Sequence, residues 1–205
     1  MNSHKSRKSK ATKKAPRKNR KLPLAIVLCA VVAIVIVVLY MSGYIGSNGS
    51  NNPGVVLLQT TMGNITIQLR NDRPITTGNF KNLVQQGVYD NTIFHRVIAG
   101  FMIQGGDPTG TGYGDPSIPN IKDELSGSNL NSRGTIAMAN TGQPDTGSSQ
   151  FFINVVDNNY LDTKHSVFGT VISGINVVDD ISNVGTDDGD KPLTDVKIIK
   201  AEIIG

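Results

Sequence analysis

Hydrophobic and polar positions divide the chain into three zones. Residues 1–21 hold almost no apolar side chain, residues 22–41 form an apolar run without a charge, and residues 55–205 alternate short apolar runs with Gly, Asn and Pro. A polar, basic stretch cannot bury enough surface to fold, so we predict a disordered tail at residues 1–21. Residues 42–54, which are rich in Gly, Ser and Asn, are predicted to form a flexible linker.

Short strands and two helices are predicted within the third zone. Ile65, Ile67 and Leu69 alternate with polar residues, which is the period of a strand with one buried face. By the same reasoning we expect strands at 55–59, 64–69, 92–98, 102–105, 135–139, 150–155, 167–172 and 195–204, and helices at 76–86, capped by Thr76 or Thr77, and at 174–183. Many short strands with Gly turns favour a mainly β fold, a closed barrel with helical covers, over a βαβ sheet.

The second zone has the length of a membrane-spanning helix. Its 20 residues would rise about 30 Å as a helix, which is the thickness of the hydrocarbon core of a bilayer. A secretory signal peptide has a shorter apolar core, about 7–15 residues, followed by a small-residue cleavage site. Since no Ala-x-Ala follows this longer run, we predict one uncleaved transmembrane helix at residues 22–41.

Charge gives this predicted anchor an orientation. The chain has a formal net charge of +4, but ten Lys and Arg lie in residues 1–21, and the remainder holds 10 basic and 16 acidic residues. Positive charges stay on the cytoplasmic side, so we expect a cytoplasmic tail at residues 1–21 and an extracytoplasmic domain at residues 55–205 in the cell membrane. An acidic domain argues against nucleic acid as a partner. A nucleic-acid-associated protein using the basic tail is the alternative, and the adjacent apolar run argues against it.

The sequence holds little that could bind a metal or form a covalent intermediate. Its three histidines, His4, His95 and His165, lack the spacing of metal ligands, and there is one cysteine, Cys29. The nucleophile motif Gly-x-Ser-x-Gly is also absent. We therefore expect no metal site and no cofactor.

Three segments carry an unusual combination of side chains: FHRVIAGFMIQGGD at residues 94–107, GTIAMANTGQPDTGSSQFFI at 134–153 and YLDTKHSVFG at 160–169. Taken singly, the apolar residues would be interpreted as core and Arg96 as a solvated or paired side chain. Together these segments resemble the cyclophilin family of peptidyl-prolyl cis-trans isomerases, and the resemblance extends over nearly all of residues 55–205. It implies a closed eight-stranded antiparallel barrel with two capping α-helices and an active-site groove on its outer face.

The resemblance also implies roles for individual residues. Catalysis is expected at Arg96, Phe101, Gln104 and His165. Substrate binding is expected at Met102, Gly110, Ala139, Asn140, Gln150, Phe152, Tyr160 and Leu161, of which Met102, Phe152 and Leu161 would join Phe101 in a proline pocket. The implied substrates are proline-containing segments of unfolded or exported polypeptides, whose folding the enzyme would assist outside the cytoplasm.

Two departures from the family pattern affect these expectations. Tyr160 stands where many members have Trp at a position that contributes to cyclosporin binding, so we expect this chain to bind cyclosporin weakly. The stretch between Asn140 and Gln150 is one residue longer than the common pattern, through Gln143-Pro144. A non-catalytic binding module is the second alternative, and the presence of Arg96 favours an enzyme.

Overall fold

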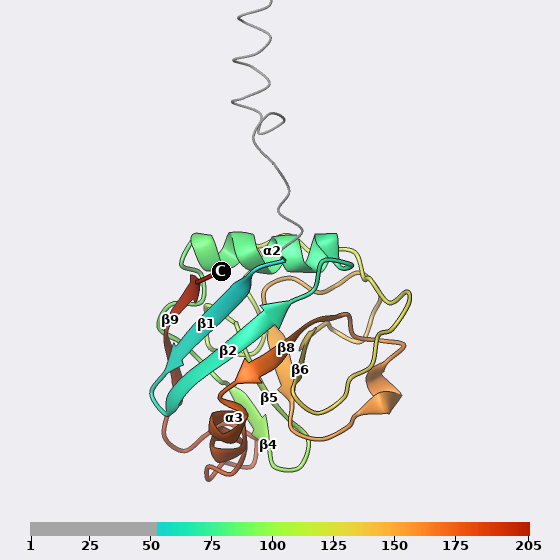
Figure 1. The fold of residues 1–205 in the computed structure, drawn as a ribbon. Coiled ribbons are helices and arrows are strands. Elements are labelled where there is room, and N and C mark those ends of the chain that lie inside the picture. The colour runs from blue at the N-terminus through green and yellow to red at the C-terminus, as the bar shows by residue number, and fades with distance from the viewer. Residues whose placement is uncertain (1–52) are drawn as a thin grey trace, which may run out of the picture. The chain divides into compact units, whose positions relative to one another are not determined.

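The computed structural model describes residues 53–205 (Figure 1). The tail and membrane helix predicted at residues 1–21 and 22–41 lie outside the described residues, as does nearly all of the predicted linker. Within the described part, no helix combines the length and the apolar content that crossing a bilayer requires.

The described residues form one antiparallel sheet. Its strands are β1 (Val55–Thr60), β2 (Gly63–Leu69), β3 (Thr92–Ile93), β4 (Arg96–Ile98), β5 (Met102–Gly105), β6 (Thr135–Met138), β7 (Phe151–Asn154), β8 (Val167–Ser173) and β9 (Lys197–Ile203). They pair in the order β3-β9-β1-β2-β8-β6-β7-β5-β4, and Figure 1 shows the sheet strongly curled. Seven of the eight predicted strands lie within about two residues of observed ones.

The prediction of a closed eight-stranded barrel was wrong in its strand count and its closure. The single strand expected at residues 92–98 is two strands, β3 and β4, which pair with β9 and β5 respectively. Phe94 and His95 join them, and the N–H of Phe94 still donates to the carbonyl of Val196 at 2.9 Å. No ladder joins β3 to β4 within residues 53–205, so the curled sheet is completed by this bent chain segment.

Two α-helices cover the ends of the curled sheet. Helix α2 (Pro74–Gln85) lies across one end, and α3 (Ile175–Ser182) lies at the other (Figure 1). The prediction that Thr76 or Thr77 caps this helix was wrong. Helix α2 begins earlier, at Pro74, whose ring suits the first helical turn. The N-terminal donors are satisfied instead by Glu124, which accepts from the N–H groups of Ile75 and Thr76.

Alternating residues of the strands pack on opposite faces of the sheet. In β7, Phe151 and Ile153 belong to the main core with both helices, whereas Phe152 belongs to a second apolar cluster. Met102 in β5 and Val167 in β8 also join the second cluster, while their neighbours enter the main core. The sheet therefore carries a large core on one face and a small apolar cluster on the other.

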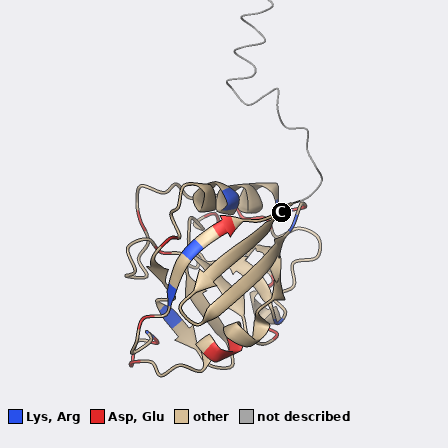
Figure 2. Ribbon diagram, turned by 60° about the vertical axis from the view of Figure 1, so that its left-hand side comes forward, with Lys and Arg blue, Asp and Glu red and all other residues tan. Residues whose placement is uncertain are grey.

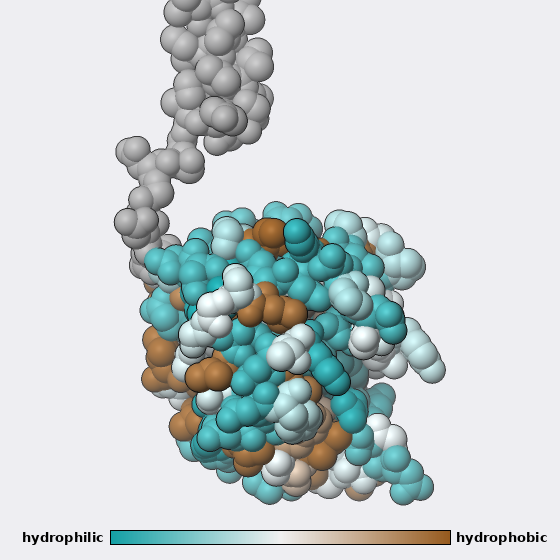
Figure 3. All heavy atoms as spheres, turned by 90° about the vertical axis from the view of Figure 1, so that its right-hand side faces the viewer, coloured by the Kyte–Doolittle hydropathy of each residue, from teal (hydrophilic) through white to brown (hydrophobic). Residues whose placement is uncertain are grey.

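The surface of the domain is mixed in polarity. From the side shown in Figure 3, hydrophilic residues separate small hydrophobic patches. Charged residues are scattered over the elements in Figure 2, with acidic residues on α3 and mainly basic ones along β9.

Candidate active site

The second apolar cluster forms the floor of a groove. Met102, Ala137, Phe152 and Val167 are buried in it, and partly buried side chains pack around them, namely Ile98, Phe101, Ala139 and Leu161. The floor is rigid because its four buried members come from four neighbouring strands of the sheet, in the order β8, β6, β7 and β5. An apolar ring lying on this floor would lose contact with water without displacing the main core.

A cavity of about 350 Å³ lies over this floor. It is lined by Arg96, Phe101, Met102, Gln104, Ala139, Asn140, Thr141, Gly142, Phe152, Leu161 and His165. The structure therefore brings together nine of the twelve residues that sequence analysis assigned to a site. Thr141 and Gly142 were missed, because a Thr-Gly pair in a loop carries no signal of its own.

Among the described residues, Arg96 is the only arginine or lysine that lines the groove. Its backbone pairs with Gln104 across β4 and β5, so the two side chains leave the same face of the sheet. The Nε of Arg96 donates to Oδ2 of Asp190 at 3.2 Å, a contact that sequence analysis did not find. A half-exposed guanidinium thus stands at the border of an apolar floor, where charge development on a bound group can be stabilised.

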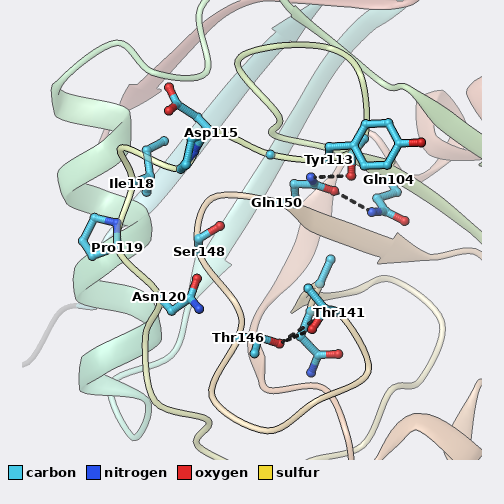
Figure 4. A pocket seen from close by; sticks show the side chains of 15 residues that line it. Gln104, Tyr113, Asp115, Ile118, Pro119, Asn120, Thr141, Thr146, Ser148 and Gln150 are labelled. Atoms are coloured by element: carbon cyan, nitrogen blue, oxygen red, sulfur yellow. Dashed lines mark hydrogen bonds between the residues drawn. The ribbon is translucent and has the colours of Figure 1, made fainter.

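Two side-chain amides form the polar wall beside Arg96. Gln104 Nε2 donates to Gln150 Oε1 at 2.8 Å, and Gln150 Nε2 donates to the Gly112 carbonyl at 3.0 Å (Figure 4). The two bonds run in one direction and fix both amide orientations. The Gln104 carbonyl oxygen is left as an acceptor for the N–H of a bound peptide.

A buried carboxylate holds the Gly-rich loop that contacts Gln150 in this polar wall. Asp107 is fully buried, and its oxygens accept from the N–H groups of Thr109, Gly112 and Gly114 at 2.7 to 3.2 Å. Burial raises the pKa of Asp107, but these hydrogen bonds together outweigh it and hold the pKa below its ordinary value. The Gly-rich stretch is therefore a charge-stabilised loop that presents Gly112 to Gln150.

His165 enters the groove as a neutral imidazole. Its Nδ1 lies 3.0 Å from the Met138 carbonyl, which can only accept, so Nδ1 carries the proton. Its ring meets Phe152 edge-on with centroids 5.2 Å apart. Burial lowers the pKa of His165, and the bond to Met138 raises it by less, so the pKa lies below its ordinary value. Nε2 is then a hydrogen-bond acceptor near neutral pH.

Asn140 shapes the opposite rim. Its Nδ2 donates to the Lys164 carbonyl at 2.8 Å, and its Oδ1 accepts from the N–H of Gly142 at 3.0 Å. The longer loop that follows is closed by the hydroxyls of Thr141 and Thr146 at 2.9 Å. The extra residue at Gln143-Pro144 is thus accommodated in an ordered turn that keeps Asn140 at the groove.

A second cavity, of about 600 Å³, adjoins the first. The two share Gln104, Ala139, Asn140 and Thr141, and Figure 4 shows the second between the loop carrying Tyr113 to Asn120 and the loop carrying Thr141 to Gln150. Gln150 lines this second cavity rather than the first. A polypeptide in the groove therefore has space to continue beyond its central residue.

Two predicted site residues lie elsewhere. Gly110 is not among the residues lining either cavity, and a Cβ added to it would lie 3.5 Å from Cδ1 of Ile93. Tyr160 is 66% exposed outside the cavity, where its ring stacks on Phe101 at a centroid distance of 6.2 Å. Among the described residues no cluster of His, Cys, Asp and Glu could hold a metal ion.

Comparison with known proteins agrees with this geometry. Residues 55–203 match the family model described as cyclophilin type peptidyl-prolyl cis-trans isomerase/CLD. The chain is similar to peptidyl-prolyl cis-trans isomerase-like 1 of Neurospora crassa, with 46% identity over 73% of this chain and 93% of that protein. It is also similar to peptidyl-prolyl cis-trans isomerase ppi1 of Schizosaccharomyces pombe, with 48% identity over 71% of this chain and 96% of that protein.

A solved structure shares the fold. It is a cyclophilin type peptidyl-prolyl cis-trans isomerase of Cryptosporidium parvum, determined in the presence of the dipeptide Ala-Pro. Its TM-score to this chain is 0.70 at 34% identity, covering 74% of this chain and 99% of that one. The family match, the identity to these relatives and the shared fold together show that this chain belongs to the cyclophilin family and is a peptidyl-prolyl cis-trans isomerase.

Proposed function

We propose that this isomerase acts outside the cytoplasm on X-Pro bonds of exported polypeptides, using Arg96 over the apolar floor, and that residues 22–41 hold it in the membrane. The observation that carries the catalytic part is the position of the Arg96 guanidinium at the border of a floor built from Met102 and Phe152. No group that could form a covalent intermediate is needed for the reaction.

Rotation about an X-Pro bond is slow because the amide C–N bond has partial double-bond character. The barrier is about 18–20 kcal/mol, and unaided isomerisation takes tens to hundreds of seconds. Catalysis requires only that the site bind the twisted amide better than either planar form. In the twisted amide the prolyl nitrogen regains its lone pair, and the Arg96 guanidinium can donate to it. Arginine suits this role because it stays protonated and its donors are rigidly arranged.

The remaining groove residues suit a polypeptide on either side of that bond. The apolar floor can hold the pyrrolidine ring, while Gln104 and Asn140 offer amide groups to the flanking backbone. The Cryptosporidium parvum structure determined with Ala-Pro supports proline-containing segments as ligands. The adjoining cavity supports segments longer than a dipeptide.

The extracytoplasmic role is supported by sequence outside the family domain. The family match begins at residue 55, so the basic stretch and the 20-residue apolar run precede the isomerase domain. Ten positive charges lie before the run and none directly after it, which favours a cytoplasmic N-terminus. Clients emerging unfolded on the far side of the membrane are therefore the proposed substrates.

Protease accessibility tests this topology. We expect protease added to intact cells or spheroplasts to cut the linker at residues 42–54 and release an active isomerase domain, while an epitope at the N-terminus stays protected. A cytoplasmic marker protein must remain intact as the control. If the isomerase domain stays protected until the membrane is broken, the orientation is inverted. If neither the domain nor the N-terminal epitope is found in the membrane fraction, residues 22–41 are not an anchor.

Weak cyclosporin binding is proposed from Tyr160. The exposed phenol stacks on Phe101 but offers a smaller face than an indole and places its polar hydrogen differently. Losing one hydrogen bond and some contact area corresponds to about 5- to 150-fold weaker affinity. We expect Tyr160→Trp to tighten cyclosporin inhibition by that factor with little change in kcat/KM, measured by titrating both proteins with the drug. Equal inhibition constants would exclude Tyr160 as the determinant.

A further inference from the structure

A tight turn lies against the edge of the strand that carries Arg96. In residues 187–192, the Asp187 carboxylate accepts from the N–H groups of Gly189 and Lys191, each at 2.9 Å. The N–H of Asp187 donates to the Lys191 carbonyl at 2.9 Å, and that of Asp190 donates to the Asp187 carbonyl at 3.1 Å. The turn is therefore fixed by its own hydrogen bonds.

Asp190 attaches this turn to β4 through its backbone. Its φ is 66°, in the left-handed region that residues other than glycine adopt rarely and at a cost. In this conformation its carbonyl accepts from the N–H of Val97 at 2.8 Å, on the side of β4 that does not pair with β5. The strained residue is thus held one position along the strand from Arg96.

The side chain of Asp190 reaches Arg96 from the same place. Its Oδ2 accepts from Nε of Arg96 at 3.2 Å, and the two side chains are 44% and 42% exposed. It is the one ion pair that Arg96 makes among the described residues. A contact at Nε leaves both terminal amino groups of the guanidinium available to a ligand.

We infer that Asp190 is a positioning residue that holds Arg96 by its Nε and keeps the terminal amino groups at the groove. A long, half-exposed arginine side chain samples many rotamers. Without a partner, Arg96 would occupy the rotamer that reaches the substrate for only part of the time. Asp190 restricts that freedom before the substrate arrives. This inference rests on the proposed role of Arg96 in catalysis.

The left-handed backbone allows a clean test. Glycine adopts this conformation without strain, so Asp190→Gly removes the carboxylate and leaves the turn intact. Asparagine also tolerates it, and the amide oxygen of Asp190→Asn can still accept from Arg96 without a charge. Asp188 is exposed in the same turn, and Asp188→Asn is the matched control.

The experiment measures kcat and KM of the full chain for a proline peptide, together with thermal stability. We expect Asp190→Gly to lower kcat about 3- to 10-fold with KM within about twofold and an unchanged or higher melting temperature. Asp190→Asn should fall between Asp190→Gly and the wild type, and Asp188→Asn should match the wild type. An unchanged kcat in Asp190→Gly would overturn the inference, as would a decrease that appears only with a lowered melting temperature.

The same assay in an Arg96→Ala background separates the two claims. If Asp190 acts through Arg96, adding Asp190→Gly to Arg96→Ala has no further effect on kcat. If Asp190→Gly lowers kcat by the same factor in both backgrounds, the positioning role of Asp190 is overturned, while the proposed role of Arg96 is unaffected. Full activity of Arg96→Ala alone would instead refute the proposed role of Arg96, whatever Asp190 does.

Discussion

Replacing Arg96 by alanine is expected to lower kcat/KM by about 10²–10³ while the fold survives. The loss follows from removing a donor that acts on the twisted amide and has little to bind in the planar one. The fold should survive because the side chain is half-exposed, and its ion pair with Asp190 is of the surface type that contributes about 0–1 kcal/mol. Isomerisation of a proline peptide, with circular dichroism as the check on folding, measures both parts.

Arg133 provides a matched control for this variant. Its exposure is 43%, against 44% for Arg96, and it also pairs with an aspartate, Asp179. It is not among the residues that line the groove. Arg133→Ala should therefore keep kcat/KM near the wild-type value. A folded Arg96→Ala protein with the same activity as Arg133→Ala would remove the mechanism proposed for this enzyme.

The largest effect on stability is expected at Gly174. This residue precedes α3 with a φ of 84°, and a Cβ there would lie 2.1 Å from the Asn64 carbonyl oxygen. Gly174→Ala combines a left-handed backbone with a clash against main chain that cannot rotate away, so we expect a loss of about 3 kcal/mol or more. For a domain of this size the melting temperature should fall by roughly 6–12 °C.

Gly78 is the opposite case in the same chain. It lies exposed within α2, and a Cβ there would meet nothing within 4 Å. Gly78→Ala should therefore stabilise the domain by about 0.5–1 kcal/mol, because alanine loses less conformational freedom on entering a helix. Calorimetry of both variants measures these two changes in stability. A Gly174→Ala protein as stable as Gly78→Ala would contradict the close approach of α3 to β2.

Local patterns predicted most of the strands but not how the sheet closes. The alternation of Ile65, Ile67 and Leu69 is a property of consecutive residues, and β2 forms where it predicts. The bend between β3 and β4 has no Gly or Pro to mark it. At this bend the Phe94 ring packs against Gly105 of β5, where an added Cβ would lie 3.1 Å from Cδ1 of Phe94, so the bend depends on a glycine of another strand.

The start of α2 illustrates the same limit. Threonine is a common cap, so the sequence favoured Thr76 or Thr77, but the group that satisfies the first turn is Glu124, 48 residues further along the chain. The active site has the same limit. Resemblance to a motif identified Arg96, but its partner Asp190 lies 94 residues away in the chain and was found only in the folded structure. Residues that act through long-range contacts carry no pattern that a local reading can detect.

The structure of the full chain with a bound proline peptide tests the central claim most directly. We predict the pyrrolidine ring on the floor of Met102 and Phe152, with a terminal amino group of Arg96 within hydrogen-bonding distance of the prolyl nitrogen. The flanking backbone should meet Gln104 and Asn140. A peptide bound in the second cavity alone, or one whose prolyl nitrogen lies out of reach of Arg96, would contradict the account.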